Sequence, residues 1–318
     1  MRNERGFALL AVMLVMALLA VIVTEFAVST RLEASMIRSY KDGILAAHLA
    51  EAAVQQAIRE IMGPGTVVAL DEDGTVSFYR TVDTSVVPVK LSRLPRQKVG
   101  LGSGEFSYRI SDEESRLNVN VSARDRVDRL FATMGLDKQV RDIINDSLQD
   151  WKDPDDLHRI NGAESEDYYL KLPVPYRARN GRLQDVAELL QIRGVTPEIY
   201  RGDNSRPALA DLVTVVGRDT INMNTAPAPV LAALGFSQAE LAEITATRVR
   251  TPYTSVPARF AGKGLGVGSA TFRIEAEGLV AGEPRARLVA IVQRQAQLTL
   301  AGGSATKVVI VSWRPADR

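Results

Sequence analysis

The clearest pattern in the chain is a continuous apolar run near its N-terminus. Seventeen apolar residues follow one another from Phe7 to Val23, and the run resumes at Phe26 after Thr24 and Glu25. A helix needs about 20 such residues to cross the hydrocarbon core of a bilayer. The short preceding segment carries two Arg and one Glu, which favours a cytoplasmic N-terminus. We therefore expect one membrane-spanning helix, with everything after it on the far side of the membrane.

The helical pattern does not stop at the membrane edge. Apolar residues recur at spacings of three and four until the breaker at residues 63–65, Gly-Pro-Gly. A helix over residues 7–62 would be about 84 Å long at 1.5 Å per residue, so half of it stands outside the membrane. Its apolar stripe comprises Leu32, Met36, Tyr40, Ile44, Ala47, Ala50, Val54, Ile58 and Ile61. We expect contact with another subunit at five of these positions, namely Tyr40, Ile44, Val54, Ile58 and Ile61.

Beyond the breaker, the pattern changes to the alternation of apolar and polar residues that is typical of strands. Such segments occupy residues 75–80, 105–111, 271–276, 287–294 and 307–313. A mainly helical pattern separates the second from the third. We therefore predict an α+β fold, in which the long N-terminal helix packs on one antiparallel sheet. The sheet domain comprises residues 63–122 and 263–318, and an all-α domain of residues 123–262 is inserted into it.

The inserted segment contains an internal repeat. Residues 117–123 (LNVNVSA) precede a Gly135 turn, and residues 221–226 (INMNTA) precede a Gly235 turn in the same way. A third, partial copy ends in a turn at Gly194. Each copy predicts a helical hairpin. The alternating Asn residues of the first two copies, Asn118, Asn120, Asn222 and Asn224, are expected to bond to backbone groups.

Composition narrows the function classes. The chain has a net charge of +1, no Cys and two His, which excludes disulfides, thiolate zinc sites and a His cluster for transition metals. No P-loop, HExxH or Gly-x-Ser-x-Gly motif is present, so we do not expect an enzyme. The hairpins resemble helix-hairpin-helix DNA-binding modules. Their turns have a single Gly, however, and nine acidic residues lie between Asp142 and Asp167 against Lys152 and Arg159. Such charge repels phosphate, so we expect no nucleic acid partner.

This acidic window is the strongest candidate for a metal site. Carboxylates at irregular spacing in a loop broken by Pro and Gly suit Ca²⁺. The candidate ligands are Asp150, Asp153, Asp155, Asp156, Glu164 and Asp167. A solvated loop whose Asp side chains cap helices explains the same composition, and the spacing does not decide between the two.

The N-terminus also carries a family resemblance. A basic leader that ends in Gly6, followed by Phe7 and a membrane-length apolar helix, resembles the signal of type IV pilins and type II secretion pseudopilins. The resemblance implies that residues 1–6 are a leader peptide, which prepilin peptidase removes between Gly6 and Phe7 before Phe7 is methylated. An ordinary export signal cleaved near Ser29 is the alternative. Most family members carry Glu where this chain has Ala11, and that Glu neutralises the N-terminus of the subunit ahead.

The missing Glu, the length and the helical insertion together resemble the K-type minor pseudopilins of type II secretion. This resemblance implies a single-pass inner-membrane protein with a periplasmic domain, placed at the pseudopilus tip, where it supports export of folded proteins. The implied partners are the I- and J-type minor pseudopilins, the major pseudopilin, prepilin peptidase and the inner-membrane assembly platform. Calcium in the helical domain is also implied. A minor pilin or adhesin of a type IV pilus is the alternative.

Overall fold

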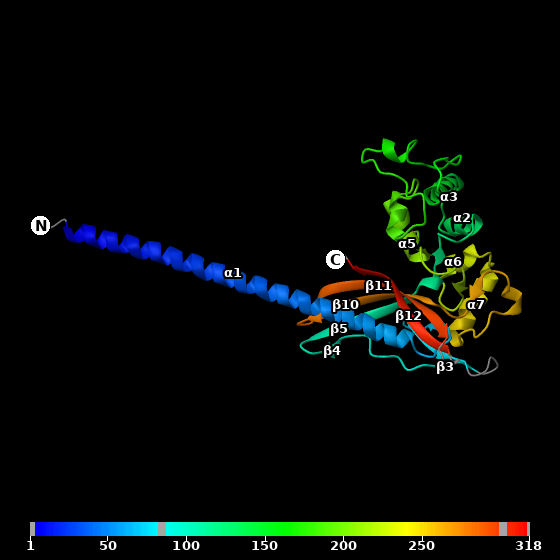
Figure 1. The fold of residues 1–318 in the computed structure, drawn as a ribbon, viewed down its shortest axis with the longest axis horizontal. Coiled ribbons are helices and arrows are strands. Elements are labelled where there is room, and N and C mark those ends of the chain that lie inside the picture. Colours follow the sequence, from blue (N-terminus) through cyan, green and yellow to red (C-terminus); the bar gives the residue numbers. More distant parts are fainter. Residues whose placement is uncertain (1–3, 82–86, 299–303, 317–318) are drawn as a thin grey trace.

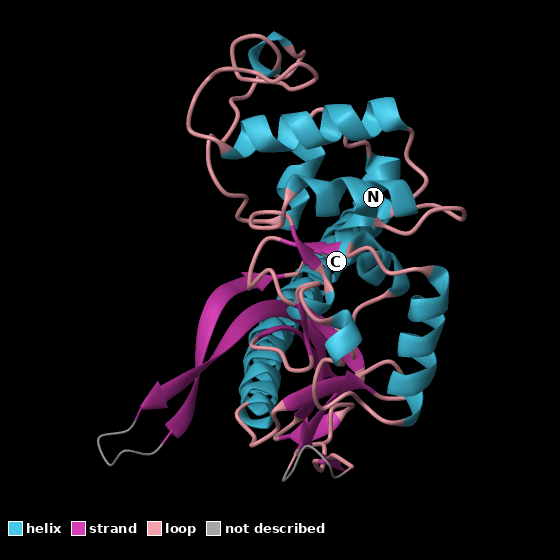
Figure 2. Ribbon diagram, turned by 90° about the vertical axis from the view of Figure 1, so that its right-hand side faces the viewer, coloured by secondary structure: helices cyan, strands magenta, loops and turns pink. Residues whose placement is uncertain are grey.

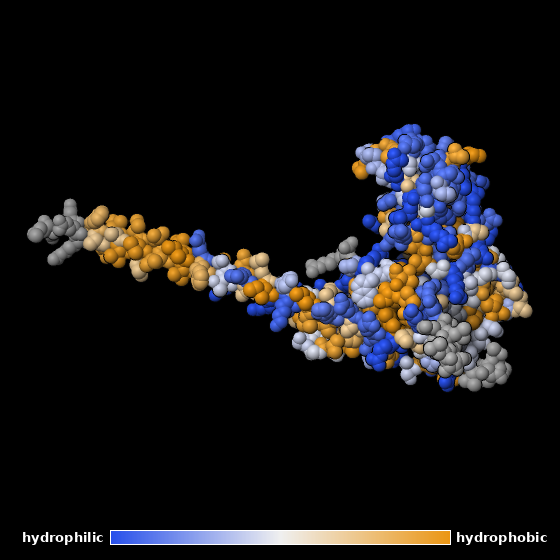
Figure 3. Space-filling view, viewed as in Figure 1, coloured by the Kyte–Doolittle hydropathy of each residue, from blue (hydrophilic) through white to orange (hydrophobic). Residues whose placement is uncertain are grey.

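A single long helix projects from the body of the protein. In the computed structural model, which describes residues 4–81, 87–298 and 304–316, α1 (Glu4–Ile61) is 58 residues long (Figure 1). Its N-terminal half extends away from the body and carries hydrophobic side chains on its surface (Figure 3). The helix ends just before Gly63-Pro64-Gly65, as the breaker predicted. The single long helix of the sequence prediction is confirmed.

The C-terminal part of α1, from Leu45 onward, lies on an antiparallel sheet of five strands. Their order is β12-β11-β10-β5-β4, with bounds β4 Val99–Leu101, β5 Gly104–Asp112, β10 Thr271–Val280, β11 Glu283–Leu298 and β12 Ser304–Pro315. The core between helix and sheet joins Leu49, Val54 and Ile61 of α1 with Ile110 and Ile274 of the strands. Because apolar side chains alternate along each strand, one face of the sheet can bury them under the helix.

The strand predicted at residues 75–80 does not belong to this sheet. It forms β2 (Val76–Arg80), which pairs with β1 (Val67–Leu70) and β3 (Val89–Lys90) in a separate three-stranded sheet. The prediction of one continuous sheet is therefore wrong at this point. The alternation of apolar residues identifies a strand, but strand pairing is decided by tertiary contacts that the pattern does not contain.

The helical domain lies between β5 and β10 along the chain, as predicted, and stands beside the sheet in space (Figure 2). Its α-helices are α2 Arg124–Thr133, α3 Lys138–Lys152, α4 Pro197–Arg201, α5 Leu209–Leu212, α6 Ala228–Ala233 and α7 Gln238–Arg250. The 3-10 helices are η1 Glu113–Ser115, η2 Tyr169–Lys171, η3 Val186–Gln191 and η4 Ala258–Phe260. The domain has its own hydrophobic core, which includes Trp151, Leu148 and Phe260.

Two short parallel strand pairs join segments of this domain that are far apart in the sequence. β6 (Leu117–Asn118) pairs with β7 (Val213–Thr214), and β8 (Ile221–Asn222) pairs with β9 (Leu265–Gly266). Alternation over more residues than these is needed before a strand can be recognised from sequence. The sequence prediction of an all-helical insertion therefore omitted them.

The predicted repeat is present in the helical domain. The α2–α3 and α6–α7 hairpins turn at Gly135 and Gly235, whose φ angles of 75° and 83° favour glycine. In the third copy the segment before Gly194 is the 3-10 helix η3 rather than an α-helix.

The paired Asn residues make the backbone bonds that we expected. In each pair, the backbone N–H of the second Asn donates to the first Asn side chain at 3.0 Å. The second Asn of each pair, Asn120 or Asn224, then donates its side-chain N–H groups to two distant carbonyl oxygens.

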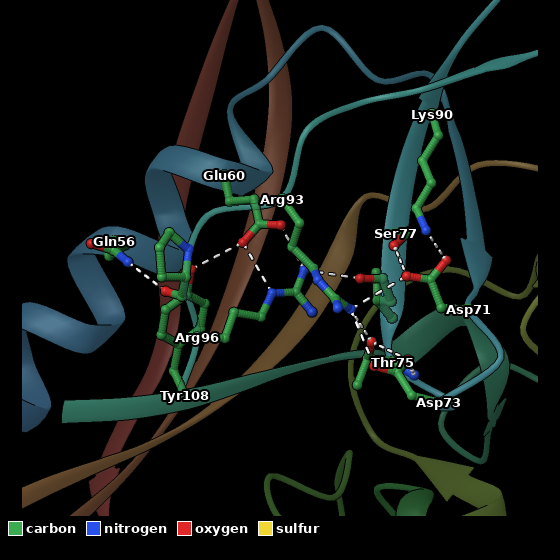
Figure 4. Close-up of polar contacts among 12 residues, drawn as sticks. Gln56, Glu60, Asp71, Asp73, Thr75, Ser77, Lys90, Arg93, Arg96 and Tyr108 are labelled. Atoms are coloured by element: carbon green, nitrogen blue, oxygen red, sulfur yellow. Dashed lines mark hydrogen bonds and ion pairs between the residues drawn. The ribbon is translucent and has the colours of Figure 1, made fainter. Parts of the chain in front are cut away.

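A buried ion pair fixes the end of α1 to the sheet region. The guanidinium of Arg96 donates to both carboxylate oxygens of Glu60, at 2.7 and 3.1 Å, and the Tyr108 hydroxyl donates to the same carboxylate at 3.0 Å (Figure 4). Arg96 also donates to the carbonyl oxygen of Val76 at 2.9 Å. Such a bidentate pair is geometrically specific, so it fixes where the helix ends relative to the strands.

Candidate assembly surface and acidic loop

The first candidate surface is the exposed half of α1. Within the described residues, one helix is long and apolar enough to cross a membrane, namely α1 from Phe7 onward. None of its most apolar segment is buried inside the protein. Phe7 and Ala11 both lie in this exposed part. Apolar side chains on a projecting helix require a bilayer or other protein surfaces to cover them. The geometry therefore fits a membrane anchor and a helix that packs against neighbours.

The five predicted contact residues fall into two groups. Tyr40 and Ile44 are 73% and 45% exposed, so they are available to another subunit. Val54 and Ile61 are 0% exposed and belong to the core between α1 and the sheet, and Ile58 packs against the same core. The prediction that Val54, Ile58 and Ile61 contact another subunit is therefore corrected. Helical periodicity identifies an apolar face but does not say whether the chain's own sheet covers it.

A polar cluster joins the helical domain to the sheet, and sequence analysis did not identify it. Asp112, at the end of β5, is buried, and one of its carboxylate oxygens accepts hydrogen bonds from Asn222, Ser269 and Thr225 at 2.9, 2.6 and 2.6 Å. Burial raises the pKa of this carboxyl, and these donors oppose the rise. Residues from three distant segments thus meet at one carboxylate.

The neighbouring carboxylate, Glu113, makes the second half of this joint. It is buried and accepts from Arg273 of β10 at 2.6 Å, from Arg116 at 2.7 Å, and from the hydroxyl of Thr214 in the helical domain. Burial alone would raise its pKa, but Arg273 and Arg116 hold the pKa below the ordinary value of 4.5. The run Asp112-Glu113-Glu114 is the sequence signal that could have marked this joint, since acidic residues rarely follow a buried strand.

The acidic loop brings three of the six candidate ligands to one place. Asp150 is fully buried at the end of α3, and the guanidinium of Arg159 donates to Asp150 and to Asp153, both at 2.6 Å. Gly162 passes so close that a Cβ there would lie 1.7 Å from an Asp150 oxygen. A glycine is therefore required where the loop folds back over this carboxylate.

Glu164 is the third member and is unusual. It is 1% exposed, yet neither carboxylate oxygen has a hydrogen-bond partner among the described residues, and one oxygen of Asp153 also lacks one. Burial, together with the charges of Asp150 and Asp153, raises the pKa of Glu164 to about 7. A buried carboxylate without a donor is costly, so this arrangement favours a cation or a proton at Glu164.

The other three candidate calcium ligands accept hydrogen bonds from residues of the same region. Asp155 accepts from the backbone N–H of Leu157 at 2.9 Å, Asp156 accepts from Asn180 at 3.1 Å, and Asp167 accepts from the backbone N–H of Glu164 at 3.2 Å. In the part of the chain that the structure describes, no group of three or more His, Asp and Glu side chains is already arranged around a metal position. A cation at Asp150, Asp153 and Glu164 would therefore have to replace the Arg159 guanidinium.

Comparison with known proteins points to one family. Two family models match the chain, at residues 107–216 and 221–272, and both describe protein K of the type II secretion system. The matched segments comprise 110 and 52 residues, a little over half of the chain.

Curated relatives and a solved structure agree with the models. Type II secretion system protein K of Pseudomonas aeruginosa is 28% identical over 73% of this chain and 68% of the relative. The protein of the same name from Pectobacterium carotovorum subsp. carotovorum is 27% identical over 79% of this chain and 76% of the relative. A chain in the crystal structure of the GspK-GspI-GspJ complex of enterotoxigenic Escherichia coli matches with a TM-score of 0.62 and 16% identity, over 90% of this chain and all of that one. At that identity the structural likeness shows the fold.

Proposed function

Since this chain belongs to the type II secretion system protein K family and is a minor pseudopilin of that system, we propose that it stands at the tip of the pseudopilus and contacts the I- and J-type minor pseudopilins. The solved relative was crystallised in a complex of GspK, GspI and GspJ, which supports this choice of partners. The tip position is supported by Ala11, because a subunit without a carboxylate there has no charge with which to neutralise a subunit ahead of it.

The observation that carries the proposal is the division of α1 into an exposed part and a shorter part that is docked on the sheet. The docked part, from Leu45 onward, fixes the helix to the body. Tyr40 and Ile44, on the exposed part, continue the same apolar stripe and are not covered by the residues that the structure describes. Burying such a stripe against a neighbour's helix provides the free energy of association. The helix is thus a rigid arm that presents an apolar face to other subunits.

Cross-linking from α1 tests the proposal directly. The natural chain has no Cys, so one introduced cysteine carries a photoactivatable cross-linker at one defined place. We expect Tyr40→Cys to cross-link to the I- or J-type subunit in membranes. Arg38→Cys is the matched control, since Arg38 is also exposed but points about 160° away around the helix. Cross-linking of equal strength from both positions would contradict a contact through the stripe.

Three further parts of the proposal follow from the resemblance of the N-terminus to pilin signals. The chain is processed by prepilin peptidase between Gly6 and Phe7, anchored in the inner membrane with a cytoplasmic N-terminus, and assembled with the major pseudopilin on the inner-membrane platform. The apolar α1 supports the anchoring. Cleavage, methylation, orientation and contact with the major pseudopilin and platform stay predictions. The helix-hairpin-helix and type IV pilus alternatives have no such support from the family match.

We also propose that the acidic loop binds calcium. The support is Glu164, whose two buried oxygens lack a donor within the described residues and lie close enough to Asp150 and Asp153 for their charges to raise its pKa. Carboxylate oxygens are the ligands that Ca²⁺ prefers, and a bound cation would neutralise their mutual repulsion. These three residues would hold the ion, and its chemistry there is structural, since it would fix the loop to the end of α3.

If the acidic loop binds calcium, removing calcium should destabilise the protein. For the full chain in detergent near pH 7.5, calcium at about 100 times its Kd should raise the free energy of unfolding by about 2.7 kcal/mol. The measurement is thermal unfolding in calcium and in chelator. Glu164→Gln should abolish the difference, whereas Glu166→Gln, at an exposed position two residues away, should retain it. An unsubstituted chain that unfolds at the same temperature in both solutions would contradict calcium binding.

A further inference from the structure

A cation that belongs to the chain lies in the acidic loop. Nη1 of Arg159 is 2.6 Å from Oδ1 of Asp150 and 2.6 Å from Oδ2 of Asp153, so one nitrogen atom bridges the two carboxylates. Calcium lies about 2.3 to 2.6 Å from its oxygen ligands. The guanidinium nitrogen is therefore nearly as far from these oxygens as a calcium ion would be, and its charge would repel an ion beside it.

The guanidinium satisfies these carboxylates only in part. Both oxygens of Glu164, which lies near the charges of Asp150 and Asp153, have no hydrogen-bond donor among the described residues, and neither has one oxygen of Asp153. When all three carboxylates are ionised, one guanidinium leaves two negative charges without a counter-charge, whereas a divalent ion in its place leaves one. Calcium also accepts about six to eight oxygen ligands, so it can bind carboxylates that the guanidinium does not contact.

Arg159 can release the two carboxylates without unfolding of the loop. Its side chain is 43% exposed while that of Asp150 is 0% exposed, so the guanidinium can turn outward into solvent. The backbone N–H of Arg159 donates to Asp150 at 3.1 Å, and its carbonyl oxygen accepts from the N–H of Gly162 at 2.9 Å. These backbone bonds do not depend on the guanidinium. The loop can therefore keep its path when the side chain leaves.

We propose that Arg159 competes with calcium for the acidic loop: its guanidinium bridges Asp150 and Asp153 whenever the loop holds no ion, and calcium binds by displacing it into solvent. The inference rests on the calcium binding proposed above. Because the guanidinium keeps a counter-charge at the buried Asp150, this part of the fold is retained without calcium. The ion binds only when the guanidinium is displaced, so the competition lowers the apparent affinity for calcium. Arg159 thus sets the calcium concentration at which the loop fills.

Calcium titration of the full chain in detergent measures this competition. After calcium has been removed with a chelator, Arg159→Gln should bind calcium with a Kd at least tenfold lower than that of the unsubstituted chain, because no guanidinium has to be displaced. Arg177→Gln is the matched control. It removes the same charge from the same region, but Arg177 pairs with the exposed Glu166 at 3.1 Å, so the Kd should change less than threefold. Isothermal titration calorimetry gives each Kd.

Chemical modification of the unsubstituted chain reports the displacement itself. Phenylglyoxal reacts with arginine side chains that are free of ion pairs, and mass spectrometry identifies the modified residue. Arg159 should react at least three times faster in calcium than in chelator, while Arg177 should react equally in both solutions.

The outcomes separate the displacement of Arg159 from calcium binding. A Kd that changes no more in Arg159→Gln than in Arg177→Gln, or an Arg159 that reacts no faster in calcium, would overturn the competition and leave calcium binding intact. If neither the unsubstituted chain nor Arg159→Gln binds calcium, the competition and the proposed calcium binding are both overturned. The proposed contacts with other pseudopilins do not depend on either result.

Discussion

Replacing Gly278 with valine should lower the free energy of unfolding by about 3 kcal/mol or more. Gly278 lies in β10 directly beneath α1, and a Cβ at this position would be 1.9 Å from the carbonyl oxygen of Ala46 and 2.7 Å from its carbonyl carbon. Both obstacles are backbone atoms of a long helix, so no rotamer change relieves the clash. Overpacking of this kind costs about 1 to 3 kcal/mol where side chains can shift, and more where they cannot.

The measurement is denaturant unfolding of the full chain in detergent, monitored by circular dichroism. Gly43→Ala is the control on the helix side, because nothing lies within 4 Å of a Cβ there. That change should be neutral or stabilise the protein by up to about 1 kcal/mol, since alanine favours a helix interior over glycine. Equal unfolding midpoints for Gly278→Val and the unsubstituted chain would show that α1 does not approach the sheet this closely.

Replacing Glu113 with alanine is expected to cost about 3 to 5 kcal/mol, because it leaves Arg273 buried without its carboxylate. The Arg273 side chain is 17% exposed, so water replaces the lost partner poorly. The same change removes the bond from Thr214, which connects the helical domain to the sheet. We therefore expect the orientation of the helical domain to loosen, which limited proteolysis should detect as earlier cleavage near residues 113–122.

At acid pH, the difference in the free energy of unfolding between Glu113→Ala and the unsubstituted chain should become smaller. The folded-state pKa of Glu113 is below its ordinary value of 4.5, so its contribution to stability is complete above pH 4.5 and is lost as the pH falls through the folded-state pKa. The control is Glu277→Ala on β10, the strand that carries Arg273. Glu277 pairs with Arg287 at 2.8 Å, but both side chains are exposed, so its loss should cost about 0 to 1 kcal/mol. Similar losses in the free energy of unfolding for Glu113→Ala and Glu277→Ala would contradict the conclusion that the buried ion pair at the joint stabilises the fold.

The largest features of the fold could be predicted from the chain because they depend on local patterns. The apolar run and the three- and four-residue spacing predict α1, and Gly63-Pro64-Gly65 predicts where it ends. The Gly135 and Gly235 turns predict two helical hairpins for the same reason, since each signal lies within a few residues of the structure that it specifies.

The candidate sites could be predicted from the sequence only in part. The acidic window was visible in composition, but only the fold shows that Arg159 joins Asp150 to Asp153 and that Glu164 is buried near their charges. Asp155 and Asp156 make local bonds. The acidic run at Asp112 and Glu113 could have marked the joint, but its partners could not be predicted, because those named above lie about 100 to 160 positions further along the chain. Likewise, the stripe on α1 indicated contact surfaces without showing that the chain's own sheet covers Val54 and Ile61.

By itself, the sequence determined the long helix, its membrane-length half, the α+β class with a helical insertion and the resemblance to K-type pseudopilins. These follow from periodicity, breakers and motifs, which act over a few turns or strands. Only the tertiary structure decided which part of the apolar stripe remains exposed, which carboxylates meet, and that Arg159 bridges two of them. The physical reason is that burial and charge pairing depend on residues brought together from distant parts of the chain, and their free energies arise only once those residues are in contact.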